Sequence, residues 1–290
     1  MQAGAKAERK PSVSALHLAP PTLTRSLAPA RRLSDHHPPC PDLPPPMTET
    51  QPFTFEGPDG ALLPALLDLR ADARAGLVLA HGAGAGMEHA FMAAMALGLS
   101  ASGVAVLRFQ FPFMAQGSRR PDPPAIAQGA VRAAVAEAKR RLPAGLPLFA
   151  GGKSFGGRMT SQAQADTPLD NVRGLVFFGF PLHAAGKPDT KRAKHLAAVQ
   201  LPMLFLQGTR DELAEIGLVR DVTVPLVERA TLHVVEGADH SFHVLKRSGR
   251  NDADVLKELV DTAVGWMVAR QSPAQVAVAS SSAVRAPHPG

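Results

Sequence analysis

Between residues 51 and 269, short apolar runs alternate with stretches that have the periodicity of helices. The apolar runs predict strands at Leu62–Leu69, Gly76–Ala80, Val104–Phe109, Leu146–Ala150, Gly174–Phe178, Met203–Leu206 and Leu232–Val235. The stretches between most of them predict helices at Glu88–Leu99, Ile126–Arg141, Gly157–Gln164, Thr190–Val199 and Ala253–Arg270. Several strands are almost wholly apolar, which is typical of a sheet that helices cover on both faces. The alternation therefore predicts a single α/β domain with a mostly parallel central sheet.

The segments that flank this body differ from it in composition. Residues 1–46 contain ten of the chain's 27 prolines, and such a segment buries too little apolar surface to offset the entropy lost on ordering. We therefore expect a disordered Pro/Ala-rich extension at 1–46, a folded domain at 47–270 and a disordered tail at 271–290. Because the composition changes abruptly at Met47, translation that starts at Met47 is a second hypothesis for the extension.

Charge and composition argue against a nucleic-acid partner. The net charge is +6, but residues 47–270 carry 24 basic and 22 acidic side chains, so most of the excess lies on the flanking segments. A nucleic-acid surface needs basic groups clustered on a folded face, with aromatic side chains for stacking. Tyrosine is absent and aromatic residues make up only 5% of the chain. We therefore expect no nucleic-acid partner and leave the oligomeric state open.

The sequence predicts neither a membrane span nor a metal site. The uncharged stretch Ala90–Leu107 is interrupted by Ser100–Gly103, which favours helix, turn and strand over one span. Apolar stretches in the extension are broken by prolines and by Arg25, so no secretory signal forms. The single cysteine, Cys40, excludes a disulfide framework and a cysteine-based zinc site. We expect a cytoplasmic protein that has no membrane contact and binds no metal.

The strongest chemical signal is the sequence GGKSFGG at residues 151–157, which contains the pattern G-x-S-x-G. It directly follows the predicted strand Leu146–Ala150 and directly precedes a helical stretch, and this is the context of a nucleophile elbow. Glycines are needed because the serine is held in a strained turn that brings strand and helix close together. The nearby helix N-terminus also favours negative charge. Ser154 is therefore the candidate nucleophile.

Two other interpretations of this glycine-rich sequence compete with the elbow. Gly-Lys-Ser also occurs in phosphate-binding loops, which need the pattern G-x-x-x-x-G-K-[ST]. Counting back from Gly152 places Pro147 where the first glycine belongs, and Gly145 lies two residues too early. The phosphate-loop interpretation therefore fails by register. A glycine-rich connection without any chemistry is the second alternative.

A serine hydroxyl becomes a strong nucleophile only when a base takes its proton and a carboxylate orients that base. In the chain order serine, acid, histidine, each partner follows a strand. Asp211 comes shortly after the predicted strand Met203–Leu206, and His240 lies between the last predicted strand and the final helix. The alternatives are His233 and His243 for the base and Asp221 and Asp239 for the acid.

Acyl transfer also needs donors for the negative charge that develops on the carbonyl oxygen. One donor is the backbone N–H of Phe155, the residue after the nucleophile. The other should come from the loop after an earlier strand, which reads HGAGAGM at residues 81–87. Its small residues let the backbone approach a substrate, so we assign the second donor to Ala83, with Gly82 or Gly84 as alternatives.

These motifs together resemble the α/β-hydrolase superfamily, in its dienelactone-hydrolase-like branch. The closest resemblance is to small bacterial hydrolases related to the testis-expressed-thirty-like proteins and to subunit three of the NSL acetyltransferase complex. It is carried by the segments HGAGAGMEHAFM, RFQFPFMAQGSRRPDPP, GGKSFGGRM, GFPLHAAGKPDTKRAKHL, LQGTRDEL and ADHSFHVLKRSGR, which span the body of the chain.

The resemblance implies an α/β-hydrolase fold, with helices on both faces of the sheet. It implies Ser154, Asp211 and His240 as a catalytic triad, with an oxyanion hole formed by Phe155 and the 81–84 loop. The connection at 181–200 is too short for a large cap domain. Dienelactone hydrolase itself uses a cysteine nucleophile, whereas the elbow here carries serine, so lactone specificity is not carried over.

We therefore expect a serine hydrolase that cleaves a small to medium carboxylic ester or thioester through an acyl-enzyme, without a cofactor. Residues expected to line the substrate site are Met87, Arg119, Lys153, Arg158 and His183. The basic residues near the mouth, including Arg192, select an acidic acyl group in one interpretation and are ordinary solvated surface in the other. Two alternative functions are a catalytically silent interaction module with the same fold and an acyltransferase or perhydrolase with the same triad.

Overall fold

The computed structural model describes residues 49–270 with the exception of residue 227. The strands are β1 (Glu49–Glu56), β2 (Leu62–Leu69), β3 (Ala75–Ala80), β4 (Val104–Phe109), β5 (Leu148–Lys153), β6 (Val172–Phe178), β7 (Met203–Gly208) and β8 (Ala230–Val235). The α-helices are α1 (Ala90–Ala101), α2 (Pro112–Ala115), α3 (Pro124–Arg141), α4 (Phe155–Asp166), α5 (Ile216–Thr223) and α6 (Asp252–Val268). Short 3₁₀ helices occur at η1 (Pro58–Gly60), η2 (Lys191–Ala198), η3 (Val224–Leu226) and η4 (Lys246–Ser248).

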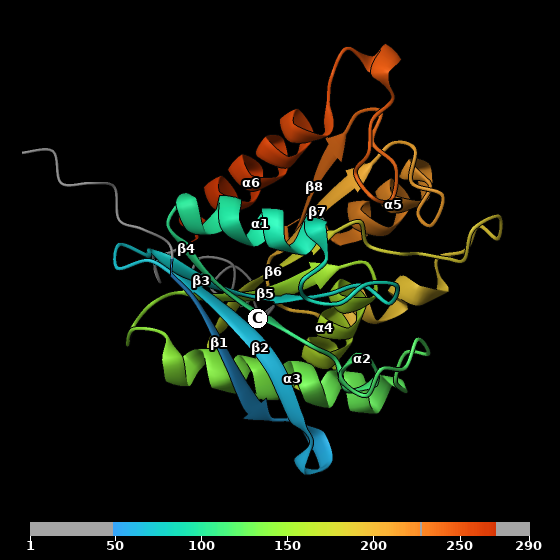
Figure 1. The fold of residues 1–290 in the computed structure, drawn as a ribbon. Coiled ribbons are helices and arrows are strands. Elements are labelled where there is room, and N and C mark those ends of the chain that lie inside the picture. The colour runs from blue at the N-terminus through green and yellow to red at the C-terminus, as the bar shows by residue number, and fades with distance from the viewer. Residues whose placement is uncertain (1–48, 227, 271–290) are drawn as a thin grey trace, which may run out of the picture. The chain divides into compact units, whose positions relative to one another are not determined.

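The strands form one sheet in the order β1-β2-β4-β3-β5-β6-β7-β8. The two pairings that involve β2 are antiparallel, and all the others are parallel. Helices α1 and α6 cover one face of the sheet, and α3 and α4 cover the other (Figure 1). The strands of the centre are buried on both faces, which explains their continuous apolar sequences. The predicted α/β class with a mostly parallel sheet is confirmed.

Several predicted boundaries need correction. Strand β1 was not predicted; it is an edge strand with a single buried residue, Phe55, and an interior proline, Pro52. The short helix α5 was not predicted either, and β5 ends at Lys153 instead of the predicted Ala150. The segment predicted as a helix at Thr190–Val199 forms a 3₁₀ helix. Its two buried residues, Ala193 and Leu196, are three apart, a spacing that suits three residues per turn.

The structure describes only the middle one of the three predicted segments. The described residues lie inside the domain predicted at 47–270, and the predictions for residues 1–46 and 271–290 fall outside them. The connection between β6 and β7 contains only η2 within the described chain, so no large cap domain covers the sheet there. Among residues 49–270, no helix combines the length and apolar character needed to cross a membrane.

A buried ion pair ties the antiparallel edge to the centre of the sheet. The Arg108 guanidinium on β4 donates to Asp68 Oδ2 on β2 at 2.9 Å, and the two side chains are only 5% and 4% exposed. Arg108 Nη1 also donates to the carbonyl oxygen of Met87 at 3.0 Å. The second carboxylate oxygen of Asp68 accepts from Thr50 Oγ1 on β1. The pair therefore links two strands to the loop that follows β3.

Removing one member of this pair is expected to be strongly destabilising. The substitution Arg108→Met leaves the Asp68 carboxylate buried without its counter-charge, which costs about 3–5 kcal/mol of the free energy of unfolding. Urea unfolding monitored by circular dichroism measures the loss. The matched control is Asp72→Ala at the exposed Arg70–Asp72 pair, which should leave the urea midpoint unchanged. Equal midpoints for the two variants would contradict this account of the pair.

Candidate active site

Ser154 stands alone between a strand and a helix, after the end of β5 and before the first residue of α4. Its backbone has φ 51° and ψ −115°, a region that residues other than glycine rarely adopt. The conformation is held by a hydrogen bond from Ser154 N to the carbonyl oxygen of Phe178 at 3.1 Å. A strained serine at the carboxyl edge of a parallel sheet is the geometry that the sequence pattern G-x-S-x-G predicts.

The glycines of the elbow are explained by close backbone approach. A Cβ atom on Gly152 would lie 2.4 Å from the carbonyl oxygen of Ala80, and one on Gly156 would lie 2.5 Å from the same oxygen. Both distances are far inside van der Waals contact. The first turn of α4 therefore packs directly on the end of β3, and only glycine fits at these two positions.

A continuous chain of hydrogen bonds joins Ser154, His240 and Asp211. Ser154 Oγ lies 2.9 Å from His240 Nε2, and His240 Nδ1 lies 2.8 Å from Asp211 Oδ2. The Asp211 side chain is fully buried, whereas that of His240 is 25% exposed. Because a carboxylate only accepts hydrogen bonds, the proton of the neutral ring belongs on Nδ1, which leaves Nε2 free to accept from the serine hydroxyl. The structure thus brings the three predicted residues together in the order that proton transfer requires.

The buried Asp211 carboxylate is held by further donors. Leu213 N donates to Oδ1 at 2.8 Å, and Gln207 Nε2 donates to Oδ2 at 2.5 Å. Gln207 lies in β7 and is itself oriented by Phe180 N, which donates to its Oε1 at 2.9 Å. No role was predicted for Gln207. The signal that could have identified it is a polar amide at the end of an apolar strand, four residues before the candidate acid.

The alternative acids and bases occupy other positions. His233 pairs with Glu258 at 2.6 Å, and exposed His243 pairs with Asp252, whose hydrogen bond raises the pKa of His243. Asp239 Oδ1 accepts from the backbone N–H groups of Ser241 and His243, and Asp221 lies exposed on α5. Among the described residues, Asp211 is the candidate acid whose carboxylate is hydrogen-bonded to the His240 ring, and Asp221 and Asp239 are not.

Two backbone segments flank the serine where an oxyanion would form. The N–H of Phe155 is at the first position of α4, where helix geometry leaves it without an intrahelical partner. The loop after β3 passes beside the serine, since a Cβ atom on Gly82 would lie 3.8 Å from Ser154 Cβ. Ala83 follows directly and is partly exposed. The assignment of Phe155 and Ala83, or Gly82, as the oxyanion donors stays a prediction.

His81 fixes the position of this loop. Its ring is fully buried, Nε2 accepts from Phe111 N at 3.0 Å, and Nδ1 lies 2.7 Å from the carbonyl oxygen of Gly82. Burial lowers the pKa of His81 to about 4, so the ring is neutral with its proton on Nδ1. His81 therefore joins the loop after β3 to the loop after β4.

Lys153 reaches across to the histidine loop. Its Nζ donates to the carbonyl oxygen of His240 at 2.5 Å and lies 5.9 and 5.4 Å from the ring centroids of Phe91 and Phe242. Burial lowers the pKa of Lys153 to about 8, although the Asp211 and Asp239 carboxylates oppose this shift. The ammonium group therefore supports the His240 backbone, and the substrate-lining role of Lys153 stays a prediction.

The Lys153 pKa predicts a pH-dependent stability. The unfolded lysine has a pKa near 10.5 and the folded one near 8, so between these values the unfolded chain binds more protons. The free energy of unfolding should therefore rise from pH 8 to pH 10 because of this group, and the variant Lys153→Met should lack that rise. Urea unfolding of both proteins at pH 7, 8, 9 and 10 provides the measurement. Parallel pH profiles for the two proteins would refute it.

The remaining residues predicted to line the substrate site are Met87, Arg119, Arg158 and His183, which lie on different elements and loops. Met87 is buried, and its N–H donates to Gln110 Oε1 at 2.9 Å. Arg119 is exposed on the loop after α2 and has no hydrogen bond or ion pair with another described residue. Arg158 lies on α4 one turn beyond Ser154, and His183 follows β6. Their roles stay predictions.

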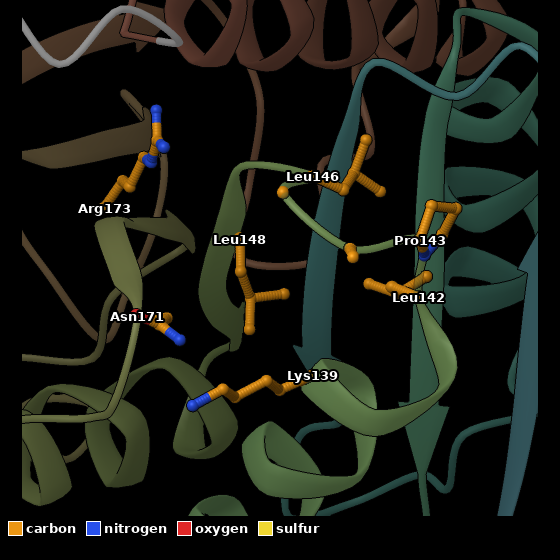
Figure 2. Close-up of a pocket in the computed structure, with 9 residues that line it drawn as sticks. Lys139, Leu142, Pro143, Leu146, Leu148, Asn171 and Arg173 are labelled. Atoms are coloured by element: carbon orange, nitrogen blue, oxygen red, sulfur yellow. The ribbon is translucent and has the colours of Figure 1, made fainter.

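Ser154 is not among the residues that line two surface hollows of the described chain. One, of about 340 Å³, lies at the opposite edge of the sheet, where β5 and β6 begin (Figure 2). It is lined by Lys139, Leu142, Pro143, Ala144, Gly145, Leu146, Leu148, Asn171 and Arg173. The other, also about 340 Å³, is lined by Phe113, Gln116, Ser118, Arg120, Pro121, Asp122 and Pro123. Within the described chain, no group of three or more His, Cys, Asp or Glu side chains is arranged to hold a metal ion.

Comparison with known proteins supports the same fold. A family model described as "Alpha/beta hydrolase domain" matches residues 73–268. A serine hydrolase without a lid from Xanthomonas campestris is similar in structure at 24% identity, with a TM-score of 0.58 over 80% of this chain and 99% of that chain. A serine hydrolase homologue from Coxiella burnetii has 19% identity and a TM-score of 0.59 over 74% of this chain and 98% of that one. A dienelactone hydrolase from Anabaena variabilis has 17% identity and a TM-score of 0.60, covering 77% and 98%. The predicted relation to the testis-expressed-thirty-like proteins and NSL subunit three stays a prediction.

Proposed function

This chain belongs to the alpha/beta hydrolase family, and on that premise we propose that it is a serine hydrolase of small to medium carboxylic esters or thioesters. The observation that carries the proposal is the unbroken hydrogen-bond chain from Ser154 through His240 to Asp211. It starts at a strained serine next to a helix N-terminus, where negative charge is favoured. A catalytically silent module would have no need of this combination.

The proposed reaction begins with proton transfer to His240. Ser154 Oγ attacks the acyl carbonyl carbon while its proton moves to His240 Nε2, and the electron pair of the carbonyl π bond moves onto the oxygen. The N–H groups of Phe155 and Ala83 are the proposed donors to that oxygen, each worth roughly 3–4 kcal/mol of the activation barrier. The buried Asp211 carboxylate stabilises the imidazolium that forms.

The acyl-enzyme then forms and breaks down. Collapse of the tetrahedral intermediate expels the alcohol or thiol, which takes the proton from His240 Nε2, and the acyl group stays on Ser154 Oγ. A water molecule attacks the acyl carbon and gives a proton to His240 Nε2. In the second collapse the bond from the acyl carbon to Ser154 Oγ breaks, Oγ takes that proton back from His240, and the carboxylic acid is released. The absence of a large cap domain from the described chain supports small to medium substrates, because an open site has little apolar surface to retain long lipid chains.

The direct test is covalent labelling by a fluorophosphonate probe. Intact-mass spectrometry should show a single adduct on the wild-type protein and none on Ser154→Ala. Circular dichroism of both proteins establishes that they are folded. A folded wild-type protein that forms no adduct would overturn the proposal.

A second measurement separates hydrolysis from acyl transfer. Ester and thioester substrates are turned over in buffer alone, with added methanol, and with added hydrogen peroxide, and the products are quantified. A hydrolase gives the free acid as its main product under all three conditions. Predominant formation of the methyl ester or the peracid would identify the protein as an acyltransferase or a perhydrolase that uses the same triad.

A further inference from the structure

Among residues 49–270 as the structure describes them, no carboxylate pairs with Arg158, which lies one helical turn from the nucleophile. Arg158 lies one turn along α4 from Ser154, and its N–H donates to the Ser154 carbonyl oxygen at 3.1 Å. The side chain is partly buried, its Nε atom is buried without a hydrogen-bond partner, and no carboxylate among the described residues pairs with it. Burial of an unpaired cation is costly, so such a group is uncommon unless a ligand completes it.

A second arginine adds to the positive charge at this position. Arg192, in the first turn of η2, also lacks an ion pair with any described carboxylate, and its field together with burial lowers the pKa of Arg158. Its Nη1 donates to the carbonyl oxygen of His183 at 2.8 Å, which holds the guanidinium at the loop after β6. Two cations are thus brought near one another without a protein anion between them.

A hydrogen bond joins the two helices that carry these arginines. His195 Nε2 on η2 lies 2.8 Å from Ser161 Oγ on α4, and Ser161 Oγ donates to the Arg158 carbonyl oxygen at 2.9 Å. Burial and the Arg158 charge lower the pKa of His195 to about 4, so this histidine is neutral and adds no charge. The backbone segments that carry Arg158 and Arg192 are therefore joined to each other.

His183 adds a third incomplete polar group. His183 is only 3% exposed. Its Nδ1 lies 2.9 Å from the Ala184 carbonyl oxygen, whereas its Nε2 is buried and has no hydrogen-bond partner among the described residues. The His183 backbone N–H donates to the Leu213 carbonyl oxygen, two residues after Asp211. The cluster therefore lies at the carboxyl edge of the sheet, on the same side as Ser154 and Asp211.

We infer that Arg158, Arg192 and His183 form a subsite for a carboxylate carried by the substrate. The inference rests on the proposed function and narrows it to half-esters of dicarboxylic acids. Arg158 lies only one turn of α4 beyond Ser154, so half-esters of short dicarboxylic acids are the substrates that test the subsite first. A guanidinium donates to both oxygens of a carboxylate, which makes an arginine pair selective for this group over neutral chains.

The kinetic test compares two substrates that differ in one terminal group. The test quantity is the kcat/KM for 4-nitrophenyl hydrogen succinate divided by that for 4-nitrophenyl butyrate. This ratio should exceed about 10 in the wild-type protein. It should fall by about tenfold or more in each of the variants Arg158→Met and Arg192→Met. The matched control is Arg220→Met, which removes an exposed charge from α5 and should leave the ratio unchanged. Removal of the uncompensated cation should also raise the thermal unfolding midpoint of Arg158→Met, which a purely structural arginine would not do.

Outcomes that reject the subsite differ from outcomes that reject the hydrolase. Turnover of butyrate with no preference for succinate, in wild type and variants alike, overturns the subsite and leaves the hydrolase intact. Failure of both substrates together with failure of fluorophosphonate labelling overturns the proposed function. In that case the subsite is tested by titration calorimetry, which measures the binding of free succinate to the Ser154→Ala variant. Binding to Ser154→Ala that is lost in the double variant Ser154→Ala/Arg158→Met supports the subsite. No binding of succinate to Ser154→Ala overturns the subsite.

Discussion

Replacing Ser154 by alanine is expected to lower kcat for ester hydrolysis by about 10⁵- to 10⁶-fold, because the variant has no atom that can form the acyl-enzyme. His240 and Asp211 then keep their mutual hydrogen bond but have no hydroxyl to activate. Any residual activity comes from substrate positioning and the backbone donors. The measurement is steady-state kinetics with 4-nitrophenyl butyrate on protein purified without contact with the wild type. A loss smaller than about 100-fold would exclude Ser154 as the nucleophile, since the loss expected of a nucleophile is far larger.

The backbone of Ser154 adds a second, independent readout. Because φ is 51° and ψ is −115°, the residue is strained unless it is glycine. Ser154→Gly should therefore be as inactive as Ser154→Ala but more stable than it by about 1 kcal/mol. Urea unfolding of the two variants provides the comparison. Equal stability would show that the elbow stores no strain at this position.

The elbow and the central strands were predictable because their sequence requirements are local. Val104–Phe109 is apolar throughout because both of its faces are covered, and its predicted and observed bounds agree. The glycines around Ser154 are required by contacts within a few ångströms of the nucleophile. A steric requirement that acts locally restricts which residue types can occur within a few positions, so it can be recognised in the sequence.

Elements that depend on distant partners were not predictable in the same way. The residues Gly151–Lys153 have little strand propensity, yet they extend β5 because β3 and β6 pair with Gly151 and Gly152, and β6 also pairs with Lys153. Strand β1 forms because it pairs with β2 along its whole length, although it presents mostly exposed side chains. In both cases the neighbouring strand decides the conformation.

The supports of the site were hidden for the same reason. Lys153 donates to the carbonyl oxygen of His240, which lies 87 positions further along the chain. Gln207 donates to Asp211, but in the sequence it is only a polar residue at the end of an apolar strand. The sequence predicted the three residues that the structure joins by hydrogen bonds, because each of them follows a strand in a fixed chain order. It did not show which neighbours hold those groups still, because only the folded sheet brings them into contact.

Asp211→Asn is expected to lower kcat by about 10³- to 10⁴-fold, the second largest effect of a single substitution. In the wild-type protein both carboxylate oxygens act only as acceptors, from Leu213 N at Oδ1 and from Gln207 and His240 at Oδ2. An asparagine offers one oxygen and one NH₂ group, so it cannot satisfy both sets of donors. If the NH₂ group faces His240, the ring is driven to the tautomer that cannot accept the serine proton.

The opposite orientation of the amide is also unfavourable. With its oxygen toward His240, the NH₂ group of asparagine faces the Leu213 N–H, and the imidazolium formed during catalysis has no buried negative charge beside it. Either orientation leaves a buried donor unpaired, so stability should fall by about 1–3 kcal/mol together with kcat. The control is Asp239→Asn, whose carboxylate accepts only from backbone N–H groups outside the triad and which should retain most of its activity. A larger loss of kcat in Asp239→Asn than in Asp211→Asn would transfer the role of the acid to Asp239.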